Sequence, residues 1–524
     1  MTPFADFVTD LDTPLLKLEH SSHFTLRMAF EGGIHAFGAP GSGKTSAFKT
    51  IASAYLRTGA GMVICVTKND EIDRWIAYAR ENGREKHVVL FTENKSFNPL
   101  AWELMRHGVK GTSNAVECLM RILDSADAAM GVAGQTNDPF WPSAIRAALG
   151  YSVPLIFCAF GVVNISDVID FVTSAATKAE QYTEPAFIER SFAGQTLRKA
   201  VDNPAVRIEE AELHGYLQYW FREFPAIPSK TLGNIVISLS TKLDRFRHGR
   251  MKSVFCGRTT IVPEMTFHGA IIILCMPTLT WNEDGIIAQR IFKYMWQRAV
   301  ESRNGLDEPQ RLRPVFLWCD ESQNFVDVKD DEFLATCRSS RAGVVFMTQT
   351  LPSYFARLGE KNRDAANGLV GKFATQLFFL NSCPVTNEHA AKIIGRDLTW
   401  RATQGTSSGT TTSKGLNEGT NANRGHSSGS SHSYGGNSGG WSTNSGTNHG
   451  SGENFGANVG TGTNTSESHS RAETMDHVLE PAFFSRSLKS GGPQNNKIVT
   501  AVFFRAGARF EATGSNWLTV AFRQ

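Results

Sequence analysis

The sequence predicts an α/β fold with a mainly parallel central sheet, and three observations favour this fold. First, short and mostly apolar runs recur along the chain, at 33–37, 269–277, 314–319 and 343–347. Such runs are typical of strands that are buried on both faces. Second, residues 46–55 have the spacing of a helix soon after the first run. Third, polar side chains follow the last two runs, where the carboxyl ends of parallel strands meet at one edge of a sheet.

The run at 33–37 continues into GAPGSGKT, residues 38–45, which fills the pattern G-x-x-x-x-G-K-[ST]. The glycines let successive backbone N–H groups turn toward phosphate oxygens, and the following helix adds the positive end of its dipole. Lys44 is expected to reach the β- and γ-phosphates, and the Thr45 hydroxyl to ligate Mg²⁺. The alternative is a chance glycine-rich turn before a helix. The residues expected to bind ATP are Gly38, Gly41, Ser42, Gly43, Lys44, Thr45 and Ser46.

Two acids, Asp320 and Glu321, follow the run at 314–319, as in a Walker B element. Asp320 is expected to hold Mg²⁺ through its water shell, and Glu321 to orient or deprotonate the attacking water. A glutamate in this place indicates hydrolysis rather than transfer to a second substrate. The alternative is an ordinary strand end with two solvated acids. Gln349 follows the run at 343–347 and is expected to sense the γ-phosphate.

Arg338 and Arg341 lie between the last two predicted strands, without apolar periodicity around them. We expect them near the same edge of the sheet, where either would serve as an arginine finger on the nucleotide of a neighbouring subunit. The alternative is a pair of solvated surface arginines, which are common.

These motifs, in this order, resemble the type IV secretion coupling proteins of the TraG/TraD family, within the FtsK/HerA-like class of ring-forming DNA translocases. The resemblance rests on GAPGSGKT, on the strand end at 66–70, on 97–100, on DESQ at 320–323 and on the Thr-Gln step at 348–349. It extends to 371–379, which resembles the strand after the Thr-Gln motif. The resemblance implies a RecA-like P-loop fold and an ATP-hydrolysing motor.

The resemblance also implies partners. Members of the family work as homohexamers at the cytoplasmic mouth of a secretion channel. There they receive relaxase-bound DNA from the relaxosome and drive its export. The expected partners are therefore DNA, single-stranded during transfer, the relaxase and components of the channel.

Composition and resemblance together divide the chain into five parts. The nucleotide-binding fold is expected in three pieces, 1–100, 241–402 and 471–524. An all-α insertion is expected at 101–240, because apolar residues recur there at helical spacing. In coupling proteins such a domain caps the motor ring, so it either contacts DNA or the relaxosome or serves as a packing lid.

The stretch 403–470 is almost wholly Gly, Ser, Thr, Asn and His, and it is expected to be a disordered loop. Such residues bury too little apolar surface to offset the entropy lost on ordering. One interpretation is a tolerated surface insertion. The other is a tether for a partner or substrate, in which Tyr434, Trp441 and Phe455 supply isolated stacking groups.

The formal charge of +3 is close to neutral, so no strong basic field indicates nucleic acid. A ring would still concentrate a modest number of cations around one pore. The eight cysteines are scattered without a CxxC pair, which predicts reduced core residues. We expect no metal beyond Mg²⁺.

No basic segment followed by a long apolar stretch opens the chain, so we expect no secretory signal. The most apolar window, 153–163, is shorter than the roughly twenty residues that span a bilayer, and it is expected to be a core helix. Typical family members carry amino-terminal transmembrane helices. We therefore expect a cytoplasmic protein at the inner face of the inner membrane, which is either recruited by a separate membrane partner or belongs to a soluble subclass.

Two other functions stay open at this point. A protein-secretion or pilus-assembly ATPase would share the motor but would not bind DNA. A nucleotide-gated adaptor would bind ATP to recruit substrates and would hardly turn over, although Glu321 beside Asp320 argues against it.

Overall fold

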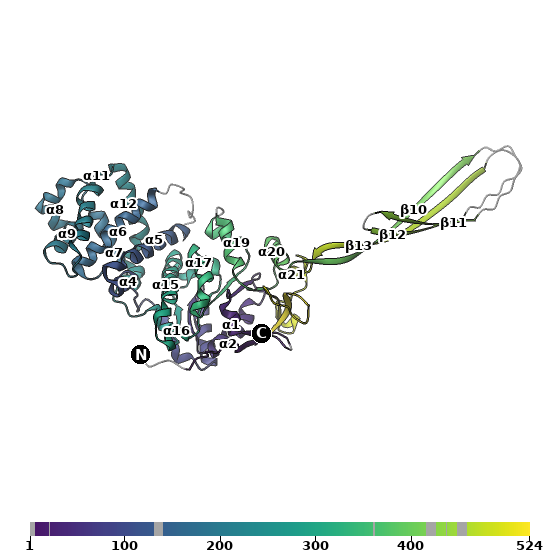
Figure 1. Cartoon of the computed structure of the whole chain (residues 1–524), viewed down its shortest axis with the longest axis horizontal. Helices are drawn as coiled ribbons and strands as arrows, with labels where there is room; N and C mark the ends of the chain where they lie inside the picture. The colour runs from purple at the N-terminus through teal and green to yellow at the C-terminus, as the bar shows by residue number, and fades with distance from the viewer. Residues whose placement is uncertain are drawn as a thin grey trace. The chain divides into compact units, whose positions relative to one another are not determined.

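The computed structural model describes residues 6–19, 21–129, 140–359, 362–415, 426–435, 438–447 and 458–524. The chain divides into two compact units. One consists of Met1–Asn387 together with Ala482–Gln524, and the other of Glu388–Pro481. The central sheet and the helices between its strands belong to the first unit (Figure 1). The division expected at residues 100, 240, 402 and 470 stays a prediction.

A nine-stranded sheet forms the centre of the first unit, within the described residues. Its strands, in spatial order, are β15 (Trp517–Arg523), β14 (Ile498–Arg505), β9 (Thr375–Phe378), β3 (Ile34–Phe37), β8 (Ala342–Thr348), β7 (Val315–Cys319), β4 (Gly61–Cys65), β6 (Ile271–Leu274) and β5 (Val88–Phe91). The strands from β9 to β5 are parallel, whereas β14 pairs antiparallel with both of its neighbours. The expected α/β fold with a mainly parallel sheet is confirmed.

Because the inner strands are parallel, their carboxyl ends lie along one edge of the sheet. β3 lies between β8 and β9, and β7 lies between β8 and β4. The segments that follow β3, β8, β7 and β4 therefore lie next to one another. This topology gathers polar groups from distant parts of the sequence at a single edge.

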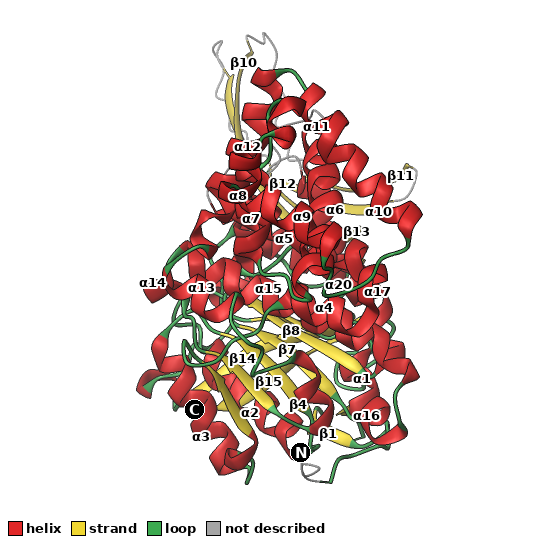
Figure 2. Ribbon diagram, turned by 90° about the vertical axis from the view of Figure 1, so that its left-hand side faces the viewer, coloured by secondary structure: helices red, strands yellow, loops and turns green. Residues whose placement is uncertain are grey.

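Helices cover both faces of the sheet (Figure 2). On one face, α2 (Lys44–Arg57) and α3 (Asn69–Glu81) pack against β7: the ring of Tyr55 stacks on Phe316 at 4.0 Å, and Trp75 meets Trp318 at 5.0 Å. The opposite face carries α15 (Glu283–Ser302), α18 (Pro352–Leu358) and α19 (Arg363–Gly371). Two hydrophobic layers thus enclose the sheet between helices and leave its carboxyl edge for the site.

The described residues between β5 and β6 are helical and contain no strand. Their helices are α4 (Pro99–His107), α5 (Thr112–Ala129), α6 (Phe140–Phe160), α7 (Ile165–Ser174), α8 (Pro185–Arg190), α9 (Phe192–Asp202), α10 (Glu210–Gln218), α11 (Phe224–Ala226), α12 (Ser229–Leu243) and α13 (Gly249–Phe255). Most of them gather at one end of the first unit (Figure 1). Asn98 begins α4 by accepting the backbone N–H of Ala101, a standard N-cap for a helix that starts with proline.

The apolar window at 153–163 falls largely in α6, which is longer than that window. Among the described residues, α6 is the one helix whose length and composition would allow it to cross a membrane. Its most apolar 18-residue window is 61% buried within the protein, and a core helix meets the same criterion.

The remaining elements of the first unit are short. They are β1 (Pro14–Lys17), β2 (His23–Thr25), α1 (Leu26–Phe30), α14 (Thr278–Trp281), α16 (Glu308–Leu312), α17 (Val328–Thr336) and α21 (Phe483–Arg486). Helix α20 (Pro384–Ile394) runs from the first unit into the second.

The second unit differs from the disordered loop expected at 403–470. Its described residues form a four-stranded antiparallel sheet in the order β10 (Arg396–Gly415), β13 (Asn458–His477), β12 (Ser438–Thr447) and β11 (His426–Gly435). Figure 1 shows the two long strands β10 and β13 side by side. The expectation counted apolar burial alone, whereas long paired strands satisfy their backbone groups without it. The parts of the expected loop at 416–425, 436–437 and 448–457, with Phe455, lie outside the described residues.

Candidate nucleotide site

The segment 38–43 joins β3 to α2 as the expected phosphate-binding loop. Two glycines are required here for steric reasons. A Cβ on Gly38 would lie 2.6 Å from Ser42 Oγ, and Gly43 has φ +87° with its absent Cβ 2.4 Å from Val499 Cγ2. Helix α2 begins directly afterwards at Lys44, and its first backbone N–H groups have no partner within the helix. The loop and the helix end therefore form a nest for anions.

Lys44 folds back over this loop. Its Nζ donates to the carbonyl oxygens of Gly38 and of Ala39, the latter at 3.3 Å. The side chain is 9% exposed, and burial lowers the pKa of Lys44, whereas the charges of Asp320 and Glu321 raise it. The ammonium group is thus held at the loop by two backbone carbonyls, which a phosphate could replace.

A cavity of about 350 Å³ opens above the loop. Among the predicted site residues it brings together Gly41, Ser42, Gly43, Lys44, Thr45, Ser46, Asp320, Glu321 and Gln349. The same cavity is also lined by residues that sequence reasoning did not identify, which are Lys68, Glu71, Arg74 and Gln524. The carboxyl ends of β3, β4, β7 and β8 all contribute to it, as the parallel topology requires.

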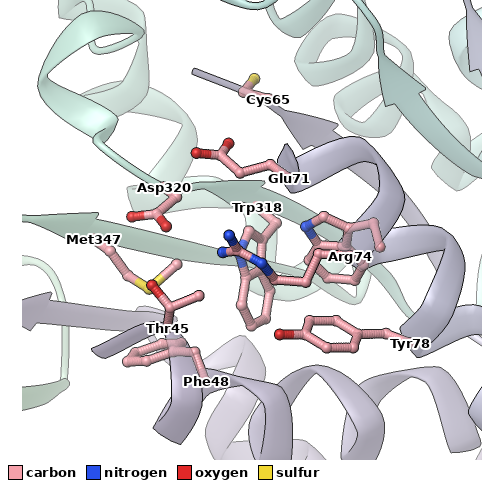
Figure 3. Close-up of a pocket in the computed structure, with 10 residues that line it drawn as sticks. Thr45, Phe48, Cys65, Glu71, Arg74, Tyr78, Trp318, Asp320 and Met347 are labelled. Atoms are coloured by element: carbon pink, nitrogen blue, oxygen red, sulfur yellow. The ribbon is translucent and has the colours of Figure 1, made fainter. Parts of the chain in front are cut away.

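Asp320 follows β7 at this edge and faces Thr45 across the cavity floor (Figure 3). Its Oδ1 accepts the backbone N–H of Glu321 at 2.9 Å. Burial, followed by the charge of Glu321, raises the pKa of Asp320, while Lys44 lowers it. The ionised form of a buried carboxylate beside a second acid is stabilised by a nearby cation.

Glu321 is held between two side-chain amides. Its Oε1 accepts from Gln349 Nε2 at 3.0 Å, and its Oε2 accepts from Gln323 Nε2 at 2.8 Å. Thr348 donates to Gln323 Oε1 at 2.8 Å and completes the chain. Glu321 itself has φ +49°, a conformation that non-glycine residues adopt rarely and mostly at functional sites. The loop after β7 is thereby joined to the loop after β8 through the carboxylate.

A second set of hydrogen bonds connects the loops after β7 and β8 to the interior of the protein. Ser322 Oγ donates to the carbonyl of Met347 at 2.9 Å and lies 2.6 Å from the Tyr354 hydroxyl. The same hydroxyl lies 2.8 Å from His35 Nε2 on β3. The three strands that present the phosphate loop, the acids and Gln349 are therefore linked in the interior of the protein.

The placement expected for Arg338 and Arg341 is wrong. Both precede β8, so they lie at the amino-terminal edge of the parallel sheet, opposite the phosphate loop. Arg341 donates to the carbonyls of Thr9 and Leu312, at 2.8 and 3.3 Å. Arg338 is more exposed and lies 3.5 Å from Glu31. Neither arginine lines the cavity of its own chain.

Glu71 is the least expected member of the cavity. It stands in the first turn of α3 and is 6% exposed, with Oε2 accepting the backbone N–H of Thr67 at 2.9 Å. Burial and then the charge of Asp320 raise the pKa of Glu71 to about 7. An acid in a first helical turn ordinarily indicates only a favourable interaction with the helix dipole, so the sequence offered little signal.

The residues present fit a magnesium ion bound together with a nucleotide. Magnesium in such sites is bound by phosphate oxygens and water, together with one hydroxyl and one carboxylate of the protein. Here Thr45 would provide the hydroxyl and Asp320 the carboxylate. Among the described residues no group of three or more His, Cys, Asp or Glu is arranged to hold a metal by itself. The metal would therefore depend on the phosphates.

Comparison with known proteins finds one family model that matches part of the chain. Residues 314–438 match the family model described as the TraM recognition site of TraD and TraG. That segment contains Asp320, Glu321 and Gln349. This part of the chain is therefore similar to TraD and TraG. A search of the curated proteins finds no match to this chain.

Solved structures of the plasmid coupling protein TrwB share the fold of this chain. The complex of TrwB with the ATP analogue ADPNP has 14% identity and a TM-score of 0.51, over 99% of this chain and 90% of TrwB. The complex with the GTP analogue GDPNP has 14% identity and a TM-score of 0.53, over 95% and 86%. The complex with ADP and Mg²⁺ has 14% identity and a TM-score of 0.50, over 94% and 86%.

Proposed function

We propose that this chain is an ATP-hydrolysing coupling protein that receives relaxase-bound DNA and drives it into a type IV secretion channel. The observation that supports this most is a single cavity that joins the phosphate loop to Asp320 and Glu321, the latter two within the segment that matches the TraD and TraG family. TrwB, which shares the fold, has been solved with ADPNP and with ADP and Mg²⁺.

The chemistry follows from the groups that line the cavity. The backbone N–H groups of the loop and the ammonium of Lys44 bind and orient the phosphates. Thr45 and Asp320 would hold Mg²⁺, which when bound would supply positive charge against the charge that develops on the phosphate oxygens. The carboxylate of Glu321 accepts a proton from the water that attacks the γ-phosphorus, which makes this residue the general base.

Gln349 would change partners when ATP binds. Its Nε2 donates to Glu321 Oε1 at 3.0 Å, and the same amide faces the cavity that receives the γ-phosphate. A phosphate oxygen that takes over this hydrogen bond frees one carboxylate oxygen for water. Gln323 keeps the other oxygen and so holds the orientation of Glu321. Hydrolysis is thereby linked to the presence of the γ-phosphate.

An arginine finger would have to come from another copy of the chain. Because Arg338 and Arg341 lie at the opposite edge of the sheet, neither reaches the phosphates of its own subunit. In a ring, that edge would face the nucleotide of the next subunit, and a homohexamer is the assembly that we propose. Arg338 is the better candidate, because its side chain is 67% exposed whereas Arg341 is engaged with backbone carbonyls.

The proposed partners follow from the family. The matched segment is described as a TraM recognition site in TraD and TraG, which supports contact with the relaxosome. We further propose that the protein works at the cytoplasmic face of the inner membrane, recruited by a membrane partner, and that its DNA is single-stranded during transfer. Within the ring, a modest number of lysines and arginines would line the DNA path.

The experiment that tests this function is the effect of DNA on ATP hydrolysis. Steady-state turnover is measured with and without single- and double-stranded DNA, over a series of salt concentrations, with Lys44→Ala as the inactive control. A DNA motor should be stimulated by DNA, and the stimulation should fall steeply with salt, because phosphate contacts release counterions. Turnover that is indifferent to DNA would instead favour a protein-secretion ATPase, and absence of turnover a nucleotide-gated adaptor.

A further inference from the structure

Glu71 is a buried acid that the mechanism above does not use. It is 6% exposed, and its Oε2 accepts the backbone N–H of Thr67 directly after β4. Among the described residues it forms no ion pair, because the neighbouring Arg74 pairs with Asp70 instead. A buried carboxylate without a paired cation is costly, so a purely structural role explains it poorly.

The surroundings of Glu71 are those of the magnesium site. The cavity above the phosphate loop and the narrower cavity beneath it are both lined by Glu71, Asp320 and Thr45. Figure 3 shows the carboxylates of Glu71 and Asp320 and the hydroxyl of Thr45 around the same space. The parallel pairing of β4 with β7, in which Cys65 lies opposite Cys319, sets the two strand ends side by side. Two acids are thereby held together where a cation is expected.

We propose that Glu71 is a third protein side chain of the magnesium site, where it accepts hydrogen bonds from water molecules bound to the metal. This inference rests on the proposed function. Thr45 would ligate the ion, Asp320 would hold its water shell from one side, and Glu71 would hold that shell from the β4 side. Magnesium keeps several of its waters in such sites, so a carboxylate that lines the cavity has a role without direct coordination.

The competing account gives Glu71 a structural role only. Glu71 would then serve only to accept the N–H of Thr67 and to favour the start of α3. The variant Glu71→Gln separates the two accounts, because a glutamine carbonyl still accepts that N–H but carries no negative charge. Asp70→Asn is the matched control: Asp70 is the neighbouring acid in the same helical turn, its side chain is 62% exposed, and it lines neither cavity.

The experiment measures Mn²⁺ binding by electron paramagnetic resonance, on the full chain with bound ADPNP. Nucleotide affinity is measured separately in EDTA. The expected result is a loss of Mn²⁺ affinity of roughly 10- to 100-fold in Glu71→Gln, the range seen for partners of metal-bound groups. Asp70→Asn should stay close to wild type, and neither variant should change nucleotide affinity in EDTA. The melting temperature of Glu71→Gln should not fall, because a buried like-charge contact with Asp320 is removed.

Two failures can be told apart. If the wild-type chain binds no Mn²⁺ in the presence of ADPNP, the proposed nucleotide function itself fails. If the wild type binds Mn²⁺ and Glu71→Gln binds it equally well, only the role of Glu71 is overturned. A lower melting temperature of Glu71→Gln together with unchanged Mn²⁺ affinity would establish the local role instead.

Discussion

The side-chain amide of Gln349 donates to the carboxylate of Glu321, with Nε2 and Oε1 3.0 Å apart. This hydrogen bond joins the loops after β8 and β7, two strands that lie side by side in the sheet. The carboxylate is occupied on both oxygens, because Gln323 donates to the other at 2.8 Å. Glu321, the residue that we propose as catalytic base, is therefore oriented before substrate binds, and in this proposal one of its oxygens must be released for water.

Removal of the side-chain amide of Gln349 or of Gln323 should lower turnover, but for a different reason in each case. Gln349→Ala should lower kcat by about 10- to 100-fold and weaken binding of ATP relative to ADP, because the γ-phosphate loses a donor. Gln323→Ala should lower kcat with little change in KM, because it only loosens Glu321. Stopped-flow binding of fluorescent nucleotides together with steady-state kinetics separates these effects. If Gln349→Ala keeps the wild-type ratio of affinities for ATP and ADP analogues, Gln349 has no role at the γ-phosphate.

Gly43 is constrained both by its backbone and by its neighbour. A Cβ here would lie 2.4 Å from Val499 Cγ2 at φ +87°. Gly43→Ala should therefore deform the phosphate loop and lower nucleotide affinity. Gly83→Ala is the control, because Gly83 has φ +69° but no atom within 4 Å of the added Cβ. The control should lose only about 1–2 kcal/mol of stability and keep its nucleotide affinity. Isothermal titration calorimetry with ADPNP measures the difference.

A buried ion pair holds α15 to the segment that follows the acids. Lys293 is fully buried, with Nζ 2.5 Å from Asp330 Oδ2 and 3.2 Å from Asp327 Oδ2. Lys293→Met should lower the free energy of unfolding by about 3–5 kcal/mol, because two buried carboxylates lose their cation. Lys49→Met, which breaks an exposed pair with Glu81, should cost under about 1 kcal/mol. Denaturant titration compares the two, and similar losses would contradict this account of the network.

The opposite placement of Lys44 and Arg338 allows a mixing experiment. Lys44→Ala and Arg338→Ala should each be nearly inactive alone. Mixed, they should recover part of the activity, because an Arg338→Ala subunit keeps an intact phosphate loop and receives Arg338 from a Lys44→Ala neighbour. Arg341→Ala serves as the comparison. If the mixture is no more active than its components while both variants still assemble, Arg338 is not a finger in trans.

The sequence predicted those parts of the site that are local along the chain. GAPGSGKT at 38–45 specifies a loop by itself, and Asp320 and Glu321 directly follow an apolar strand. Their meeting in one cavity follows from parallel topology. Arg338 lies at the opposite edge because it precedes β8, and in a parallel sheet only the segments that follow the strands reach the carboxyl edge.

Other features of the site and the fold depend on contacts between particular residues, which a sequence motif does not reveal. Glu71 reads as an ordinary acid in a first helical turn, and only its burial against Asp320 distinguishes it. Gln323 becomes significant only through its bond to Glu321. The strands β10 and β13 are long and paired, although their composition predicted no ordered structure, because backbone hydrogen bonds carry no compositional signal.

The central claim is that Glu321 activates water for ATP hydrolysis in an assembled ring. The most direct test is single-turnover hydrolysis of ATP by the wild type and by Glu321→Gln, over a series of protein concentrations. We predict wild-type rates that rise steeply with concentration, and a Glu321→Gln variant that assembles and retains ATP but cleaves it at least about 100-fold more slowly. Hydrolysis by Glu321→Gln at a rate near that of the wild type would contradict the account.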